Sequence, residues 1–341
     1  MEQLSRIGVA LLRGRLWVIL SITLLCGSLL VPGFFSLRTL AFSLDRASTI
    51  GIVAVGMTAV LIAGQIDLSS GSLVALCGIV TIGLQPMIGP WLALFLAILT
   101  GGLIGLLNGT LTIVFGIDSM IATLATMLGI SSVAFLVTGS LPVSGTDPLF
   151  GVLLTGDLVG MFTTRAAIFL LLVVLLQIWL TRLPSGRNLF AVGSDIVAAR
   201  DSGIAATRVL MGTFIFIGLC AGLSGALFSL QVNTGSPVFG VTVLLSSITA
   251  VVMGGTTLEG GKGSALGTLG GVITVTALTT ASEYASVPAY IQGIIIGTIL
   301  IVLIVLDRTI GRSLRSATDR GALIQASPEE PIPREKENRN E

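Results

Sequence analysis

Long uncharged stretches dominate the chain, and short charged segments separate them. A membrane-spanning helix needs about 20 mainly apolar residues. The first stretch, residues 16–37, follows three arginines; it is too long for the apolar core of a signal peptide and no A-x-A cleavage site follows it, so it is interpreted as a retained span. Residues 69–117 carry no charge and are long enough for two spans, joined by a turn at Gln85-Pro86 and Gly89-Pro90. The ten predicted spans cover approximately residues 16–37, 47–63, two within 69–117, 121–138, 166–180, 209–231, 241–254, 265–281 and 287–306.

The basic residues between these spans are distributed unevenly. An even number of spans places both termini on one side, and arginine and lysine accumulate on the cytoplasmic side of membrane proteins. With cytoplasmic termini, and leaving the far tail aside, the inner segments hold twelve basic residues, whereas the outer ones hold only Arg38, Arg46 and Arg165. The pattern therefore predicts an all-α, polytopic transmembrane bundle over residues 1–310 with both termini in the cytoplasm. A charged cytoplasmic tail follows over 311–341, and we expect its end to be disordered.

Composition supports a helical membrane protein. Hydrophobic residues make up 53% of the 341 and charged residues 10%, whereas a soluble chain carries about 25% charged residues. The chain contains no histidine, which excludes histidine metal sites, Ser-His triads and imidazole proton relays. Cys26, Cys77 and Cys220 are isolated within apolar stretches and form no CxxC pair, so they are interpreted as small core residues.

Two glycine-rich joints connect predicted spans on the cytoplasmic side. The first joint lies in GMTAVLIAGQIDLSSGS (56–72) and contains Asp67; the second, GGTTLEGGKGS (254–264), contains Glu259. AVLIAG in the first matches AVVMGG before the second, and both close with Gly-Ser, which suggests an internal duplication of the kind common in transporters; short apolar sequences also match by chance, so both explanations stay open. The second joint is not a phosphate-binding loop, because glycine follows Lys262 where Ser or Thr is needed.

The charge pattern places Asp67 at the cytoplasmic end of its span rather than at mid-membrane. Its carboxylate, with the hydroxyls of Ser69 and Ser70, is suited to accept hydrogen bonds at the start of the next helix. We hypothesise that the two joints form part of an inner gate. The gate or hinge residues of this hypothesis are Gly64, Asp67, Ser69, Gly71, Gly255, Glu259 and Gly263.

Nearly every charge falls at a predicted span end, which bears on the kind of transporter. A carboxylate at the bilayer centre costs about 2.5–3.5 kcal/mol on insertion scales, and ion-coupled carriers need such groups to bind their coupling ion. Their scarcity favours a channel or an externally powered permease. The cytoplasmic segment 182–208 mixes small residues with charges of alternating sign, which fits either a solvated amphipathic loop or a surface that packs against a partner.

Three segments, taken in order, carry a family resemblance. GMTAVLIAGQIDLSSGS, GRNLFAVGSDIVAARDSGI and ITAVVMGGTTLEGGKGSALGTLGG together resemble the permease subunits of bacterial ABC importers for ribose and related monosaccharides, a family that also includes autoinducer-2 permeases. The resemblance covers residues 15–310. It departs from the family at Gln65, where a glycine is usual, and at Ser119-Met120, where a proline and an aromatic residue are frequent. These departures leave the substrate open and make a heterodimer plausible.

The resemblance implies a multi-pass protein of the bacterial inner membrane that is a transport subunit and not an enzyme. It implies these partners: a second permease, identical or different, two cytoplasmic ATPase subunits that bind the ATP, an extracytoplasmic sugar-binding protein and membrane lipid, with no nucleic acid and no cofactor or metal on this chain. It also implies that residues 186–203 contain the coupling segment, which docks into the ATPase. The coupling positions are then Gly186, Gly193, Ala198, Ala199 and Gly203.

The leading hypothesis is therefore the permease of an ATP-driven importer for a monosaccharide or related small polyol, with a pathway between two permeases. Asn108, Gln231 and Asn233 are candidate polar groups of that pathway, although each could equally serve helix packing. The alternative is a self-sufficient channel or secondary carrier for a small polar solute.

Overall fold

The structure is a computed structural model, and it describes residues 20–25, 27–28, 34–159 and 162–305. The described chain is mostly helical, which confirms the predicted all-α class. A first helical segment is described over residues 20–25 and 27–28. The helices that follow are α2 (Leu37–Ile62), α3 (Ser70–Ile88), α4 (Pro90–Ile113), α5 (Ser119–Thr138), α6 (Pro148–Thr155), α7 (Thr164–Arg182), α8 (Pro184–Ser194), α9 (Ile196–Asp201), α10 (Ala206–Gln231), α11 (Val241–Met253), α12 (Ala265–Tyr284) and a last helix, Ala289–Val305. Two short antiparallel pairs complete it: β1 (Val143–Ser144) with β4 (Thr234–Gly235), and β2 (Asp157–Val159) with β3 (Phe162–Thr163).

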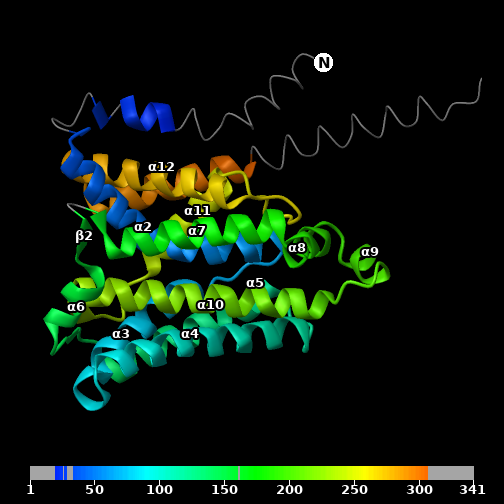
Figure 1. The fold of residues 1–341 in the computed structure, drawn as a ribbon, viewed down its shortest axis with the longest axis horizontal. Coiled ribbons are helices and arrows are strands. Elements are labelled where there is room, and N and C mark those ends of the chain that lie inside the picture. The colour runs from blue at the N-terminus through cyan, green and yellow to red at the C-terminus, as the bar shows by residue number, and fades with distance from the viewer. Residues whose placement is uncertain (1–19, 26, 29–33, 160–161, 306–341) are drawn as a thin grey trace, which may run out of the picture.

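Helices α2 and α10 form the centre of the bundle. In Figure 1, α10 lies between the layer of α3 and α4 and the layer of α2 and α7, with α11 and α12 beyond. The most apolar 18-residue windows of α2 and α10 are 89% and 72% buried, whereas those of α4 and α5 are 28% and 22% buried. The outer face of α4 and α5 is therefore apolar and exposed, as expected of helices that contact lipid or another subunit.

Glycines bring α4 and α10 into backbone contact. A Cβ at Gly101 of α4 would lie 2.2 Å from the carbonyl oxygen of Gly218 on α10, and one at Gly105 would lie 2.2 Å from that of Phe214. Real Cβ atoms do not approach so closely, so only glycine permits this contact. Small residues at helix interfaces are the usual means of packing helices in a membrane, where lipid and side chains are equally apolar.

Among the described residues, seven helices are long and apolar enough to cross a membrane. Helix α11 is not one of them, because its 13 residues rise about 20 Å and a hydrocarbon core is about 30 Å thick. The non-helical segment before it contains β4 and the buried residues Ser236 and Pro237, so residues 232–253 do not form one continuous helix. The predicted first span (16–37) lies partly, and the predicted tail (311–341) wholly, outside the described residues. The count of ten spans and the side of the termini stay predictions.

The two ends of the bundle differ in what they carry (Figure 1). Helices α8 and α9 project at one end, which we call the α8 end, and α6 and β2 lie at the other, the α6 end. At the α6 end, α2 begins at Leu37, about ten residues before the predicted start at 47, with Ser36 Oγ accepting from Thr39 N at 3.2 Å. The predicted start at 47 left Asp45 outside the second span, which was wrong, because Asp45 lies inside α2; Arg165, counted with the outer segments, lies in the first turn of α7. Both are buried within helices, because each neutralises the other.

Candidate functional site

Three segments that are distant in sequence meet at the α8 end: the end of α2 with the first joint, the helix α8, and the second joint. The amide of Gly261 donates to the carbonyl oxygen of Ile62 at 2.9 Å. A Cβ at Gly193 of α8 would lie 1.8 Å from that same oxygen and 2.8 Å from Gly261 N. Only a glycine at 193 therefore allows α8 to lie on the backbone of both joints.

The joints turn on glycines in the left-handed region. Gly64, Gly260 and Gly261 have φ angles of +73°, +86° and +71°, which glycine adopts without the cost that a side chain adds. A Cβ at Gly260 would lie 2.6 Å from the carbonyl oxygen of Gly193, so the second joint also needs glycine for close approach. We call these residues, with Ile62, the glycine junction: Ile62, Gly64, Gly193, Gly260 and Gly261.

Sequence reasoning placed Gly64 and Gly193 in different functional groups, a gate and a coupling segment, and the structure brings them together. It missed Gly260 and Gly261 as contact residues, although a double glycine beside a charged residue is a turn signal. Gly255 has a φ of +99°, and a Cβ there would have no described atom within 4 Å; Glu259 is exposed. Gly263 lies close to the end of α2, since a Cβ there would be 2.7 Å from Ile62 Cγ1.

Asp67 lies in a separate, fully buried cluster beside the junction. Its Oδ1 accepts from Ser69 N at 2.7 Å and from Ser69 Oγ at 2.6 Å, and Asn108 Nδ2 donates to Ser69 Oγ at 2.7 Å. The backbone of the first joint is also held by α5, because Leu68 N donates to Thr123 Oγ1 at 3.1 Å. Burial raises the pKa of the Asp67 carboxyl above its ordinary value, and hydrogen bonds from Ser69 and Asn108 oppose that rise.

Asn108, a candidate pathway residue, belongs to this cluster and is completely buried. Gly71, a candidate gate residue, lies in the first turn of α3, where a Cβ would meet the carbonyl oxygen of Gly240 at 2.9 Å. Gly71 thus packs α3 against the start of α11, away from the glycine junction. The predicted gate residues form two neighbouring groups rather than one.

Within the coupling segment, the small residues divide between attachment and exposure. A Cβ at Gly186 would lie 2.1 Å from the carbonyl oxygen of Trp179, so Gly186 packs α8 against α7. Ala199 is 4% exposed and lies in the hydrophobic core, whereas Ala198 beside it is exposed. Gly203 follows α9 with a φ of +81°, and a Cβ there would have no described atom within 4 Å.

The exposed part of α9 is capped and presents a mixed surface. Asp195 Oδ1 accepts from Val197 N at 2.8 Å and from Ala198 N at 3.0 Å, which fixes the first turn of α9. Val197 is 63% exposed, although it is apolar. We call the exposed residues Val197, Ala198, Arg200 and Asp201 the α9 surface.

At the α6 end, a buried ion pair organises the bundle. Arg165 of α7 donates from Nη2 and Nε to the carboxylate of Asp45 in α2. The same carboxylate accepts from Thr163 Oγ1 at 2.6 Å and from Gln231 Nε2 at 2.9 Å, and Arg165 Nη1 donates to Thr49 Oγ1 at 3.2 Å. We call Asp45, Thr49, Thr163, Arg165 and Gln231 the ion-pair cluster. Sequence reasoning missed it because its two charges are 120 residues apart.

Gln231 lines a cavity with several polar residues in its wall, and Asn233 does not. The cavity, of about 370 Å³, lies between α2, α10, α11, α12 and the helix Ala289–Val305, and the exposed ion pair of Arg46 and Glu283 borders it. Asn233 instead secures the β1–β4 pair: its Nδ2 donates to Gly145 O at 3.2 Å, and Gly145 N donates to Asn233 O at 2.9 Å. The structure therefore places the three candidate pathway residues in three different settings.

Comparison with known proteins gives consistent matches over most of the chain. The family model described as "Branched-chain amino acid transport system / permease component" matches residues 39–304. The ribose import permease protein RbsC of Haemophilus influenzae is 30% identical over 313 residues, which cover 90% of this chain and 96% of that protein. RbsC of Bacillus subtilis is 32% identical over 285 residues, covering 82% and 88%.

A further relative has a different cargo. The autoinducer 2 import system permease protein LsrD of Escherichia coli is 31% identical over 281 residues, which cover 80% of this chain and 85% of that protein. No solved structure matches the chain at a comparable level of significance. Each of these three relatives is a transport protein.

Proposed function

The chain belongs to the family of branched-chain amino acid transport system permease components, and from this we propose that it is the membrane-spanning permease subunit of an ATP-driven ABC importer. The cargo we propose is a monosaccharide or related small polyol, because relatives that match most of the chain import ribose and autoinducer 2. The proposal places the chain in the bacterial inner membrane as a multi-pass protein, with both termini and the α8 end in the cytoplasm. It assigns ATP hydrolysis to a separate subunit.

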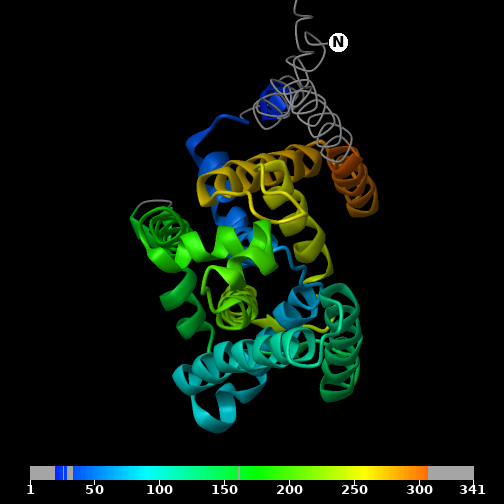
Figure 2. The same cartoon turned by 90° about the vertical axis from the view of Figure 1, so that its right-hand side faces the viewer.

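The attachment of α8 to both joints is the observation that carries the mechanism. Figure 2 looks onto the α8 end, where α8 and α9 lie across the bundle. Gly193 lies on Ile62 and Gly261 without an intervening side chain. A displacement of α8 is therefore passed directly to the first and second joints, with no flexible side chain to absorb it.

We assign the α9 surface as the docking site for the ATPase. Val197 and Ala198 supply apolar contact, and Arg200 and Asp201 supply charges that can pair across an interface. Ala199 and Gly186 support this surface from within. On this proposal the glycines of the two joints, Gly64 and Gly255 among them, are the hinges of the inner gate, and ATP binding in the partner subunits moves them through α8.

The cavity that Gln231 lines at the α6 end is our candidate for the part of the pathway that meets cargo from the extracytoplasmic binding protein. Gln231, Arg46 and Glu283 present hydrogen-bonding groups there, as recognition of a polyhydroxylated molecule needs. Asn108 and Asn233 serve packing in this proposal. The second permease would contribute the facing wall of the pathway.

Ala198→Glu tests the docking assignment, because Ala198 is exposed and its substitution leaves the core intact. Sugar uptake and substrate-stimulated ATPase activity of the complete transporter in proteoliposomes should fall by about tenfold or more. Ala285→Glu is the matched control: Ala285 is exposed after α12 at the α6 end, and its variant should retain uptake. Full uptake in the Ala198→Glu transporter would refute the assignment. The channel or carrier alternative is tested by the purified chain alone, which should transport no ribose.

A further inference from the structure

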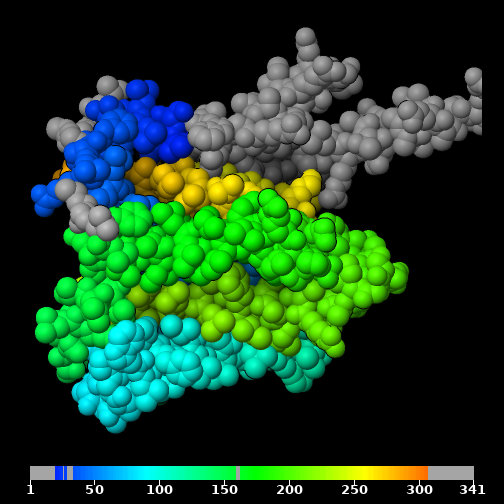
Figure 3. Space-filling model, viewed as in Figure 1, coloured from blue at the N-terminus to red at the C-terminus, as the bar shows by residue number. Residues whose placement is uncertain are grey.

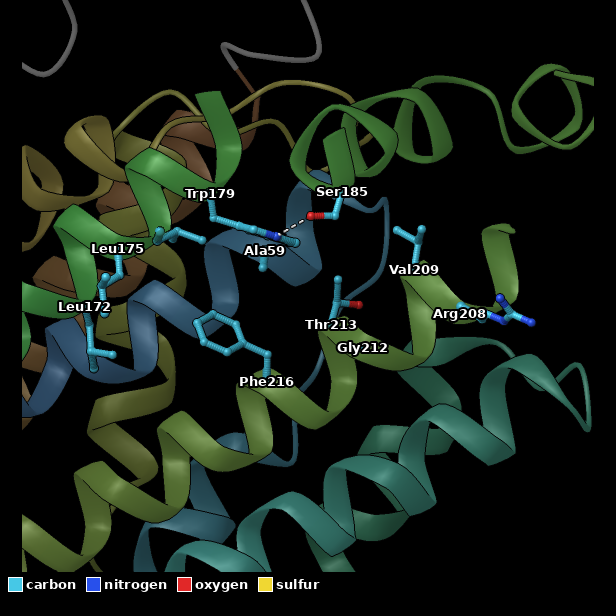
Figure 4. Close-up of a pocket in the computed structure, with 11 residues that line it drawn as sticks. Ala59, Leu172, Leu175, Trp179, Ser185, Arg208, Val209, Gly212, Thr213 and Phe216 are labelled. Carbon is cyan, nitrogen blue, oxygen red and sulfur yellow. Dashed lines mark hydrogen bonds between the residues drawn. The ribbon is translucent and has the colours of Figure 1, made fainter. Parts of the chain in front are cut away.

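A second cavity opens between α2, α7 and α10 near the α8 end. Its volume is about 530 Å³, and its lining is almost wholly apolar. Figure 4 shows its side chains from these three helices together with Ser185 of α8, and in the space-filling view the hollow lies between the surfaces of α7 and α10 (Figure 3). We call it the α7–α10 groove; residues that define it are Ala59, Leu172, Leu176, Trp179, Gly212 and Phe216.

The α8 end of the groove carries the only charged residue among the described residues that line it. Arg208, in the first turn of α10, is exposed, and it forms no ion pair with any residue that the structure describes. A cation in a first helical turn is electrostatically unfavourable by itself, because the helix N-terminus carries partial positive charge. The two positive groups together attract an anion. Trp179, whose indole Nε1 donates to Ser185 Oγ at 2.8 Å, borders the same end of the groove.

Along α10, the groove is nearly as long as one lipid leaflet is thick. From Arg208 to Phe216 the α10 backbone rises about 12 Å, and half of a hydrocarbon core is roughly 15 Å. A tryptophan at the polar end of such a groove is typical of the membrane–water interface. Basic pockets between transmembrane helices on the cytoplasmic side bind anionic lipid head groups.

We propose that the α7–α10 groove binds an anionic phospholipid from the leaflet at the α8 end. One acyl chain lies between Leu176, Gly212 and Phe216, and the phosphate lies against Arg208 and the N-terminus of α10. Under the proposed function this leaflet is the cytoplasmic one, but lipid binding itself does not depend on that function.

The occupant would brace the base of the coupling segment. Trp179 forms one wall of the groove and holds Ser185 in the first turn of α8. Ala59 forms part of the floor, one turn before Ile62 of the glycine junction. A lipid in the groove therefore contacts both elements that the proposed coupling motion must displace.

Gly212→Leu tests the proposal by filling the groove. A Cβ at Gly212 would have no described atom within 4 Å, and leucine favours a helix more than glycine does, so the variant should fold. Gly129→Leu is the matched control, since Gly129 lies in α5 with equally open space around it. Arg208→Gln removes the proposed phosphate partner and keeps a long polar side chain.

The measurement is binding of phosphatidylglycerol and phosphatidylcholine with identical acyl chains to the purified full chain, by native mass spectrometry. We expect the chain and Gly129→Leu to retain phosphatidylglycerol in preference to phosphatidylcholine. Gly212→Leu should lose the bound phosphatidylglycerol, and Arg208→Gln should bind it about fivefold more weakly. Equal binding of the two lipids by all four proteins would overturn the proposal. A change of oligomeric state in Gly212→Leu with unchanged lipid binding would also overturn it, because the groove would then be a protein interface.

Discussion

The glycine junction and the ion-pair cluster both fasten distant parts of the chain together, but they do so by opposite means. At the α8 end, backbone lies on backbone, and the contacts depend on the absence of side chains at Gly193 and Gly260. At the α6 end, buried Arg165 and Asp45 bind through their opposite charges and several hydrogen bonds. At the α6 end, separating the two charged side chains is therefore the change that destabilises the contact. At the α8 end, it is the addition of a side chain between the two backbones.

This contrast suits an importer that is driven from one side. A buried ion pair is costly to separate, since each charge left alone loses its compensation. Backbone contacts at glycines have no such penalty and can shift by small amounts if no side chain intervenes. Under the proposed function, we therefore expect the α6 end to stay fixed while the α8 end moves.

Removing one partner of the ion pair should have the largest effect. Arg165→Met leaves the Asp45 carboxylate buried without its cation, and we expect a loss of about 3–5 kcal/mol in stability. Thermal or denaturant unfolding of the purified chain in detergent measures it. Arg165→Met combined with Asp45→Leu should be less destabilising than Arg165→Met alone. If the loss of stability in the double variant equals the sum of the losses in Arg165→Met and in Asp45→Leu alone, the two charges are not energetically coupled.

Crowding the glycine junction should have the next largest effect. In Gly193→Ala the new methyl group would meet Ile62 O and Gly261 N, so α8 must move away at a cost of about 1–3 kcal/mol. Uptake by the complete transporter should also fall, and by more than the small loss of folded protein explains, because the attachment of α8 to both joints is loosened. Gly129→Ala, in open space on α5, is the control and should keep both properties. Unchanged uptake in Gly193→Ala would contradict the proposed route of coupling.

A substitution at Gly64 should lower the stability less, because it strains the backbone but brings no atoms too close together. Gly64 has a φ of +73°, but the described atoms nearest to a Cβ at this position would be 3.7 Å away, at ordinary contact distance. Gly64→Ala therefore adds only the left-handed backbone penalty, about 1–2 kcal/mol. Comparing its unfolding free energy with that of Gly193→Ala separates backbone strain from close approach. A greater loss in Gly64→Ala than in Gly193→Ala would show that strain, not crowding, dominates at the junction.

Sequence reasoning located α3, α4, α5 and both joints because hydrophobic runs bounded by polar residues are local signals. It could not find the early start of α2, since Asp45 indicates a loop until its partner Arg165 is known. The short α11 escaped for a similar reason: the apolar residues 241–254 match the composition of a span, and only the tertiary structure shows the irregular segment before them.

In the candidate site, too, local features were predictable from the sequence and contacts between elements were not. Glycine-rich segments predicted where the chain turns, but not that Gly193 would lie against Ile62 and Gly261, because that contact is set by packing between elements. Asn108 lies within an apolar stretch and Gln231 lies at the end of one. Nothing in the neighbouring sequence shows which of the two side chains is buried in packing and which lines a cavity. Their separation into the Asp67 cluster and the ion-pair cluster required the structure.

The α8 end also contains a buried carboxylate, Asp67. Unlike Asp45 at the α6 end, Asp67 has no cationic partner among the described residues, so it shows whether a buried charge matters at the α8 end too. Its Oδ2 has no hydrogen-bond partner in the described part of the chain, whereas Oδ1 accepts from Ser69. With a raised pKa, the folded state keeps the proton at pH values where the unfolded state has released it. Stability therefore decreases as the pH rises above the ordinary pKa of the carboxyl, until the folded-state pKa is passed.

Asp67→Asn should consequently have the smallest effect of the series. The amide oxygen can still accept from Ser69, and the amide group resembles the protonated carboxyl in size and polarity, so we expect a change below about 1 kcal/mol. The pH dependence that Asp67 contributes should disappear from the unfolding curves of the variant, while uptake remains close to that of the unmodified transporter. Ser69→Ala, which removes the hydroxyl that Asp67 and Asn108 share, should be more destabilising at every pH. Collapse of uptake in a correctly assembled Asp67→Asn transporter would show that this end, too, depends on a buried charge, and the contrast with Arg165 and Asp45 would fail.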